Sequence, residues 1–354
     1  MPIHDLAKVD NDFYFQWHIT DRCNLRCKHC YQTEYSDARE LTIDELKKIA
    51  DKVCLALTKW NARGKIAITG GEPLLRDDLP ELLEYLQESP AVAQFEVLSN
   101  ATLLTSETVQ LLKTFSKFHS FQISLDGGTE ETHDSIRGTG SFAKAITGIR
   151  LLRANNIPVR LMFTIHRGNA KDISRLIELA IEEDVDAITI ERFVPTGSGS
   201  ALSHLVLSPT ELRDIYQYVA GRADEEYEKG TKLKILKFRS LWVLLDPERS
   251  KAAIETPVHT DLGAMCSIGI DSLCILPDAT VLPCRRLGIP IGNLLEDSVF
   301  KIWYTSDLLW QLRNKDNLKG KCNECELIPR CGGCRATAYA MTGDYLAEDP
   351  QCWA

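Results

Sequence analysis

The chain has 354 residues, of which 44% are hydrophobic and 26% charged, and its formal net charge is -9. This length suggests one large domain accompanied by a smaller one. The acidic balance lacks the basic stripe and high pI of a nucleic-acid binder, and no apolar run is long enough for a transmembrane helix or a signal peptide. We therefore expect a cytoplasmic protein with no nucleic-acid or membrane partner.

Strands and helices are predicted in alternation between residues 13 and 193. Thr42 and Glu45 form a capping-box signature, Pro80 falls in a first helical turn, and Ser106 is expected to cap a helix. Such alternation predicts parallel strands with right-handed crossovers, in an open sheet or in most of a barrel. The predicted strands span 13–20, 65–69, 95–99, 121–125, 159–165 and 187–193, and the predicted helices span 42–60, 78–87, 106–115, 142–155 and 173–183.

A second region begins after residue 193. Glycine, serine and proline mark a connecting loop, a helix is expected near 210–229, and a short mixed bridge follows to about residue 260. The last segment has short elements and eight cysteines, so its order is expected to depend on bound metal. We divide the chain into a domain over 13–200, a bridging helical region over 201–261 and a cysteine-rich domain over 262–354.

Three cysteines follow the first predicted strand, in the spacing C-x3-C-x2-C. In a reducing compartment, clustered thiols indicate metal or catalysis before disulfides. Zinc would need a fourth ligand, and His29 is badly placed to act together with Cys30. A four-iron cluster on Cys23, Cys27 and Cys30 would leave one iron open for chemistry. Zinc, or coincidental buried thiols, are the alternatives.

Four pieces of the first region resemble the radical S-adenosylmethionine (radical SAM) superfamily. They are CNLRCKHC (23–30), TGGEPLLR (69–76), ISLDG (123–127) and HDSIRG (133–138), and they occur in the family's order. The resemblance implies a partial (β/α)6 TIM-like barrel. It also implies that Cys23, Cys27 and Cys30 ligate three irons of a 4Fe-4S cluster, whose fourth iron is chelated by the amino and carboxylate groups of SAM.

The same resemblance implies further SAM-binding residues. The backbone of Gly70, Gly71 and Glu72 would receive the amino group, and Pro73 would shape the turn. Ser124 and Asp126 are expected near the ribose, with turn or helix-cap roles as their alternatives. Asn100 either faces the ligand or caps a turn. Arg137 either pairs with the SAM carboxylate or a substrate anion, or lies solvated on the surface.

The C-terminal cysteines suit either zinc or iron–sulfur clusters on spacing alone. The segment resembles the SPASM domain, which implies two auxiliary 4Fe-4S clusters and three clusters in total. Two departures concern local loop shape: Ala279 stands where the family usually has glycine, and the gap from Cys331 to Cys334 is one residue short. The implied ligands are Cys266, Cys274, Cys284 and Cys334 for one cluster and Cys322, Cys325, Cys331 and Cys352 for the other.

The resemblance implies a mechanism but leaves the substrate open. An electron from a flavodoxin- or ferredoxin-type donor would cleave SAM, and the 5′-deoxyadenosyl radical would abstract hydrogen from the substrate. We expect a peptide substrate, crosslinked through thioether or carbon–carbon bonds or oxidised, which is bound either through a separate peptide-recognition protein or by direct docking. The alternative is a dehydrogenase or decarboxylase of a sugar, a tetrapyrrole or another small molecule. In such an enzyme Arg285 and Arg286 would bind carboxylates, and a solvated role or charge balance for a cluster are the alternatives for these two residues. A zinc-stabilised binding scaffold is the non-catalytic alternative.

Overall fold

Ten strands form one continuous sheet in the order β10-β9-β8-β1-β2-β3-β4-β5-β6-β7. The structure is a computed structural model that describes residues 9, 12–237, 240–248 and 266–354. The strands are β1 (Asp12–His18), β2 (Arg63–Thr69), β3 (Val92–Ser99), β4 (Phe118–Ser124), β5 (Val159–Ile165), β6 (Ala187–Arg192), β7 (Lys234–Leu236), β8 (Ser272–Ile275), β9 (Thr280–Leu282) and β10 (Gly292–Asn293).

The first six strands pair in parallel and in chain order. A doubly wound sheet would reverse its order part of the way, so this sequential order indicates barrel winding. The two edges, β7 and β10, are not paired with each other among the described residues, and the barrel is therefore incomplete. The predicted partial (β/α)6 barrel is confirmed, and each of its six predicted strands overlaps an observed one.

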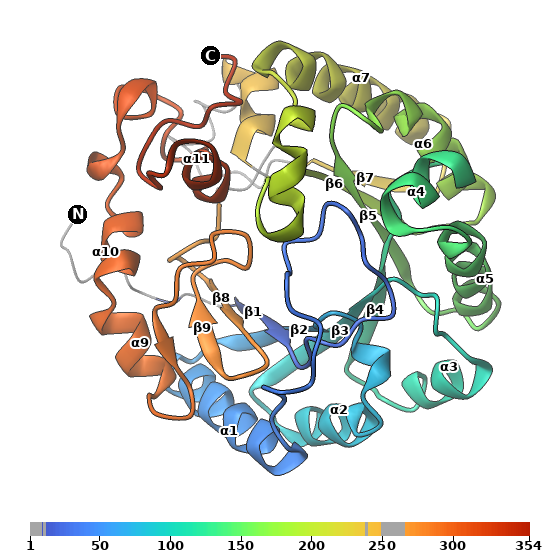
Figure 1. Ribbon diagram of the computed structural model, residues 1–354, viewed down its shortest axis with the longest axis vertical. Helices are drawn as coiled ribbons and strands as arrows, with labels where there is room; N and C mark the ends of the chain where they lie inside the picture. The colour runs from blue at the N-terminus through green and yellow to red at the C-terminus, as the bar shows by residue number, and fades with distance from the viewer. Residues whose placement is uncertain (1–8, 10–11, 238–239, 249–265) are drawn as a thin grey trace.

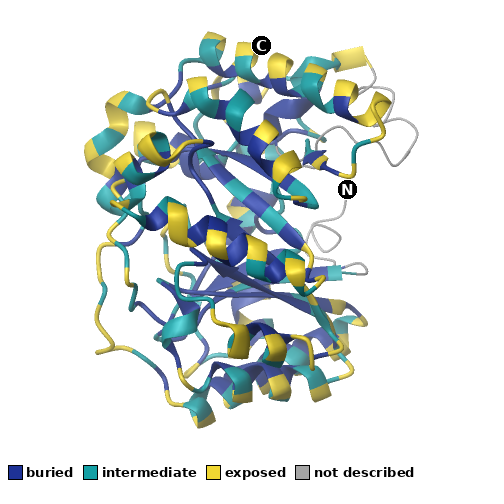
Figure 2. Cartoon of the chain, turned by 90° about the vertical axis from the view of Figure 1, so that its right-hand side faces the viewer, coloured by how far each residue is buried: buried dark blue, intermediate teal, exposed yellow. Residues whose placement is uncertain are grey.

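Helices cover the outside of the curved sheet (Figure 1). Their inner faces are buried against the strands and their outer faces are exposed (Figure 2), as the amphipathic sequence pattern predicts. The capping box of Thr42 and Glu45 is present, and Pro80 lies in the first turn of its helix. These helices are α1 (Ile43–Trp60), α2 (Leu79–Glu88), α3 (Ser106–Leu112), α4 (Glu130–Arg137), α5 (Ser141–Ala154), α6 (Ile173–Glu182) and α7 (Pro209–Glu228).

Two local details differ from the sequence expectations. Thr105, not Ser106, caps α3, because its hydroxyl accepts the backbone N–H of Thr108. Helix α4 was not predicted, since its polar sequence buries only His133 and Ile136 and shows no apolar period. This short helix ends at Arg137 and so positions one of the predicted SAM-binding residues.

The C-terminal segment continues the barrel sheet. Its strand β8 pairs in parallel with β1, and β9 and β10 extend that edge as antiparallel strands. At the other edge, β7 of the bridging region pairs with β6. These strands were not predicted, because runs of two to four residues carry no periodicity. The remaining helices are α9 (Val299–Thr305), α10 (Asp307–Arg313) and α11 (Arg335–Thr342).

The predicted division into three parts stays a prediction, and the later part of the bridging region lies outside the described residues. The connecting loop expected after residue 193 contains 3-10 turns over Gly197–Leu205. No helix in the described part of the chain is long and apolar enough to cross a membrane.

Candidate functional site

The loop that follows β1 is docked onto the GGEP segment by its backbone. The N–H groups of Gly71 and Glu72 donate to the carbonyl oxygens of Thr20 and Arg22, both at 2.8 Å. A Cβ on Gly70 would overlap the carbonyl oxygen of Thr20, and one on Gly71 would overlap that of Arg22. The two glycines therefore permit close approach of backbone to backbone, which positions the cysteine loop before any ligand binds.

The main cavity of the protein has a volume of about 690 Å³, and its lining includes Cys23, Cys27 and Cys30. Each sulfur accepts one donor: Leu25 N at 3.4 Å from Cys23 Sγ, Arg137 Nη1 at 3.8 Å from Cys27 Sγ, and Gln32 N at 3.4 Å from Cys30 Sγ. Such donors suit thiolates, the form in which cysteine binds metal. Burial raises the pKa of the Cys23 thiol to about 11, and the nearby Glu72, Cys27 and Cys30 add to the effect. A bound cation would reverse this shift.

The side chain of Glu72 faces the protein interior. It is fully buried, and its carboxylate accepts hydrogen bonds from Ser99 Oγ at 2.7 Å, Asn100 N at 2.9 Å and Leu74 N at 3.2 Å. Burial raises the pKa of this carboxyl to about 7. Pro73 opens the 3-10 turn Pro73–Leu75, as its predicted turn-shaping role requires. Since an amino group donates hydrogen bonds, the predicted SAM contact at this segment would fall to carbonyl oxygens.

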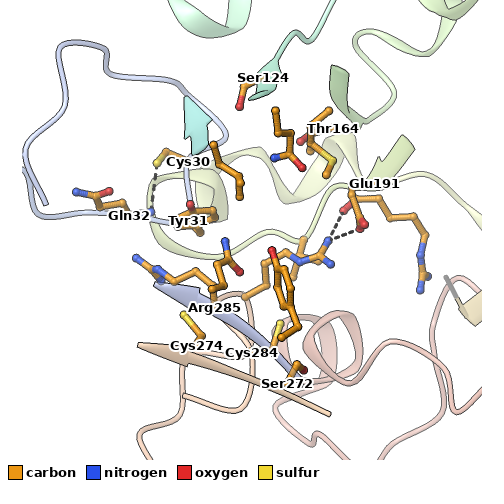
Figure 3. A pocket seen from close by; sticks show the side chains of 18 of the residues that line it. Cys30, Tyr31, Gln32, Ser124, Thr164, Glu191, Ser272, Cys274, Cys284 and Arg285 are labelled. Atoms are coloured by element: carbon orange, nitrogen blue, oxygen red, sulfur yellow. Dashed lines mark hydrogen bonds and ion pairs between the residues drawn. The ribbon is translucent and has the colours of Figure 1, made fainter. Parts of the chain in front are cut away.

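Asn100 and Ser124 both line the cavity, at the carboxyl ends of β3 and β4. Ser124 is seen at the cavity in Figure 3. The Asn100 side chain accepts from Thr102 N at 2.9 Å and donates to Asn24 Oδ1 at 2.9 Å. Asn100 therefore caps its own turn, the second of the two roles left open by the sequence, and it also holds the cysteine loop. Their contacts to SAM stay predictions.

Asp126 and Arg137 form a buried ion pair behind the cavity. Arg137 Nε lies 2.5 Å from Asp126 Oδ2, which also receives His29 Nε2 at 2.9 Å, while Oδ1 accepts Thr164 N at 2.8 Å. Burial would raise the pKa of Asp126, but the charges of Arg137 and His29 outweigh it and hold that pKa far below its usual range.

These contacts change the roles predicted for the pair. Arg137 is buried and so is not a solvated surface residue; it lines the cavity wall. Asp126 is fully buried, and both of its oxygens are occupied. Any influence of Asp126 on a bound ribose would therefore act through Arg137 and His29.

The eight C-terminal cysteines fall into two groups. Four face the main cavity and are called the cavity cysteines: Cys266, Cys274, Cys284 and Cys334. The other four line a separate, mostly apolar pocket of about 230 Å³ and are called the back-pocket cysteines: Cys322, Cys325, Cys331 and Cys352. This grouping follows the division implied by the resemblance, and the ligation itself stays a prediction.

Clustered thiols are the donor type that iron–sulfur clusters and zinc share. Within the described residues, no three His, Cys, Asp or Glu side chains lie close enough together to hold a single metal ion. All twelve cysteines are free thiols, eleven of which belong to the three groups above.

Two arginines place positive charge beside Cys334. Arg192 pairs with Asp349 at 2.9 Å, and Arg286 pairs with Glu191 at 3.0 Å. Burial would raise the pKa of the Cys334 thiol, but these two arginines outweigh it and lower that pKa. Asp349 also accepts the backbone N–H of Cys334 at 2.7 Å and so positions this cysteine.

Sequence reasoning missed Glu191, Arg192 and Tyr31 as cavity residues. The first two end β6, and the rule that chemistry gathers at the carboxyl ends of barrel strands could have found them. Tyr31 directly follows Cys30, but a single tyrosine in a loop carries no signal of what it will contact.

The sequence and the fold were compared with known proteins. The Radical SAM superfamily profile matches residues 17–180, and the SPASM profile, an iron–sulfur cluster-binding domain, matches residues 266–326. An AdoMet-dependent heme synthase of Methanosarcina barkeri is 34% identical over 345 residues, which covers 95% of each chain. An Fe-coproporphyrin III synthase of the same organism is 30% identical, over 95% of this chain and 86% of its own.

Other matches carry different names. AlbA of Bacillus subtilis, an antilisterial bacteriocin subtilosin biosynthesis protein, is 30% identical over 89% of this chain and 65% of its own. Among solved structures, anSMEcpe with bound AdoMet has a TM-score of 0.75 at 18% identity, covering 96% of this chain and 94% of its own. Streptococcus suis SuiB bound to precursor peptide SuiA has a TM-score of 0.74 at 17% identity, covering 99% and 78%. Because the two solved structures share less than 25% identity with this chain, their likeness supports the fold alone. This chain belongs to the radical SAM superfamily and carries a C-terminal SPASM domain, which implies 4Fe-4S clusters and SAM binding.

Proposed function

We propose that this protein is a radical SAM enzyme that acts on a carboxylate-bearing iron tetrapyrrole. The observation that carries the proposal is the 34% identity to a heme synthase over 95% of both chains. The names of two relatives each contain an iron tetrapyrrole. The tetrapyrrole, which was an alternative in the sequence analysis, thus replaces the peptide as the first candidate substrate.

The chain's own residues would divide the work as follows. Cys23, Cys27 and Cys30 would hold the first cluster, and the GGEP backbone with Arg137 would orient SAM beside it. When bound, the first cluster and SAM together supply the radical that removes a hydrogen atom from a carbon of the substrate. The cavity of about 690 Å³ then has to align the substrate carbon with that radical and exclude water.

A decarboxylation satisfies the atom and electron balance. Loss of one hydrogen atom, one electron and CO2 from a propionate side chain leaves a vinyl group, which is how Fe-coproporphyrin III and heme differ. The hydrogen atom would go to the 5′-deoxyadenosyl radical and the electron to an iron–sulfur centre at the cavity cysteines. We further propose three 4Fe-4S clusters in total and a flavodoxin- or ferredoxin-type reductant.

Peptide modification is the second candidate. The 30% identity to AlbA, over 89% of this chain, favours it. A peptide would enter the same cavity and, as we expect from the sequence, would need either a separate recognition protein or direct docking. Its carbon–hydrogen bond would meet the same radical.

The test uses the anaerobically reconstituted enzyme with SAM and dithionite. Incubation with Fe-coproporphyrin III should yield 5′-deoxyadenosine together with vinyl-bearing porphyrin, resolved by mass spectrometry. Release of 5′-deoxyadenosine with an unchanged porphyrin would reject the tetrapyrrole substrate and retain the superfamily assignment. A peptide encoded beside this gene, modified under the same conditions, would establish the second candidate instead.

A further inference from the structure

Five arginines line the main cavity, and four of them are neutralised by a carboxylate of the protein. The fifth, Arg285, forms no ion pair within residues 9, 12–237, 240–248 and 266–354. The four pairs are Arg137–Asp126 at 2.5 Å, Arg160–Glu96 at 2.7 Å, Arg192–Asp349 at 2.9 Å and Arg286–Glu191 at 3.0 Å.

Arg285 stands between the two cysteine regions that face the cavity. It directly follows Cys284, and its guanidinium carbon lies 4.3 Å from the ring centre of Tyr31, which directly follows Cys30. Figure 3 shows the Arg285 side chain between Tyr31 and Cys274. Its Nε is buried and has no hydrogen-bond partner among the described residues.

An acidic group within reach of the Arg285 charge already has an ion-pair partner. Asp21 feels the charge of Arg285, but its carboxylate pairs with Arg39 at 2.6 Å. A buried guanidinium donor without an acceptor is costly, and its planar fork matches a carboxylate. Glu191, which also lines the cavity (Figure 3), pairs with Arg286, the residue next to Arg285 in the chain.

We propose that Arg285 binds a carboxylate of the substrate and thereby determines that the enzyme accepts carboxylate-bearing substrates. This inference rests on the proposed tetrapyrrole function. The bound carboxylate would be held between the loop of Cys30 and the strand of Cys274, which is where the hydrogen atom and the electron have to leave the substrate. Arg286 cannot do the same, because Glu191 already occupies its guanidinium.

A different role has to be separated from this one. Arg285 lies close enough to Cys274 to lower the pKa that burial raises there. It could therefore serve only to balance the charge of thiolates or of the cluster they hold. Such an arginine would change the properties of the iron–sulfur centre and leave substrate affinity unaltered.

The experiment measures binding of Fe-coproporphyrin III and of its tetramethyl ester to reconstituted enzyme by ultrafiltration. Arg285→Gln should bind the free acid roughly tenfold to a hundredfold more weakly than the wild type, which is the effect of a charged hydrogen bond. Both proteins should bind the ester equally. Arg285→Lys keeps the charge without the fork and should be intermediate. The matched control is Arg213→Gln, an exposed arginine of α7 paired with Asp214, which should bind like the wild type.

Iron content and SAM cleavage without porphyrin show whether each variant is intact. If Arg285→Gln loses iron, Arg285→Lys decides, and wild-type affinity of that variant for the acid overturns the proposal. The proposal is also overturned if Arg285→Gln binds the free acid like the wild type but shows an altered electron paramagnetic resonance signal. That result would mean that Arg285 balances the charge of the cysteines or of the cluster they hold. Equal binding of the acid and the ester by the wild type also overturns the proposal, whereas failure of the wild type to bind either porphyrin rejects the proposed function itself.

Discussion

The barrel and the C-terminal segment hold their cysteines by different kinds of structure. In the barrel, three cysteines share one loop, and Gly71 and Glu72 fasten that loop by backbone hydrogen bonds. In the C-terminal segment, eight cysteines come from β8, from the start of α11 and from turns between short elements. The comparison indicates that backbone contacts hold the first site in place, and it remains our prediction that the order of the second depends on what its cysteines hold.

Charge separates the two C-terminal groups as well. The cavity cysteines have Arg192, Arg285 and Arg286 around them, whereas Lys321 and Asp349 are the charged side chains that line the back pocket. Because Asp349 neutralises Arg192 and Glu191 neutralises Arg286, Arg285 is the charge through which we propose that the cavity group meets an anionic substrate. The back-pocket group is enclosed by Leu241, Leu244 and Ile328 and is expected to act without substrate contact.

The largest expected effect separates the barrel site from the back pocket. Cys27→Ala should reduce SAM cleavage below detection, because the first cluster would lose one of its three ligands. Cys325→Ala should keep part of the cleavage but lose product. The measurement is 5′-deoxyadenosine release by dithionite-reduced protein, with Cys54→Ala on α1 as the control thiol. Equal loss in both variants would mean that the first site depends on the back pocket.

The next largest effect is expected for the buried ion pair that joins Arg192 of the barrel to Asp349 of the C-terminal segment. Arg192→Gln leaves Asp349 buried without its charge partner, which should lower the free energy of unfolding by about 3–5 kcal/mol. Urea unfolding measures this change. Arg175→Gln, which removes an exposed pair with Glu182, should cost less than about 1 kcal/mol. Equal costs for the two variants would show that the buried pair does not join the regions.

Gly71→Ala tests whether the cysteine loop is fastened by close backbone contact. The added Cβ would overlap the carbonyl oxygen of Arg22 and should cost about 1–3 kcal/mol of stability, together with most SAM cleavage. Gly221→Ala in α7 meets nothing within 4 Å and should be neutral or slightly stabilising. Wild-type SAM cleavage by Gly71→Ala would argue against a preformed loop.

The smallest effect is expected at Ala279, in the turn between β8 and β9. This alanine has a φ of 65°, the left-handed conformation that favours glycine, and it is fully buried. Ala279→Gly should relieve about 1 kcal/mol of backbone strain and lose about 0.8 kcal/mol of methyl burial. The free energy of unfolding, measured by thermal denaturation, should therefore change by less than about 1 kcal/mol. A larger loss of stability would show that the turn needs the methyl group.

Much of the fold could be predicted because its signals are local. Apolar runs predicted the six barrel strands, and the capping box placed the start of α1. The strands β7 and β8 and the polar helix α4 could not be predicted, since they are short or lack an apolar period. Their positions come from pairing and packing with residues distant in the chain.

The sequence by itself determined the superfamily, through the spacing of Cys23, Cys27 and Cys30 and the segments that follow the next strands. Only the tertiary structure decided which charges are free. Arg285 and Arg286 are adjacent in sequence, yet Glu191, far away in the chain, neutralises only the second. Asp126 likewise turned from an expected cavity residue into a buried partner of Arg137. Ion pairing depends on distances in space, and local sequence patterns do not record these.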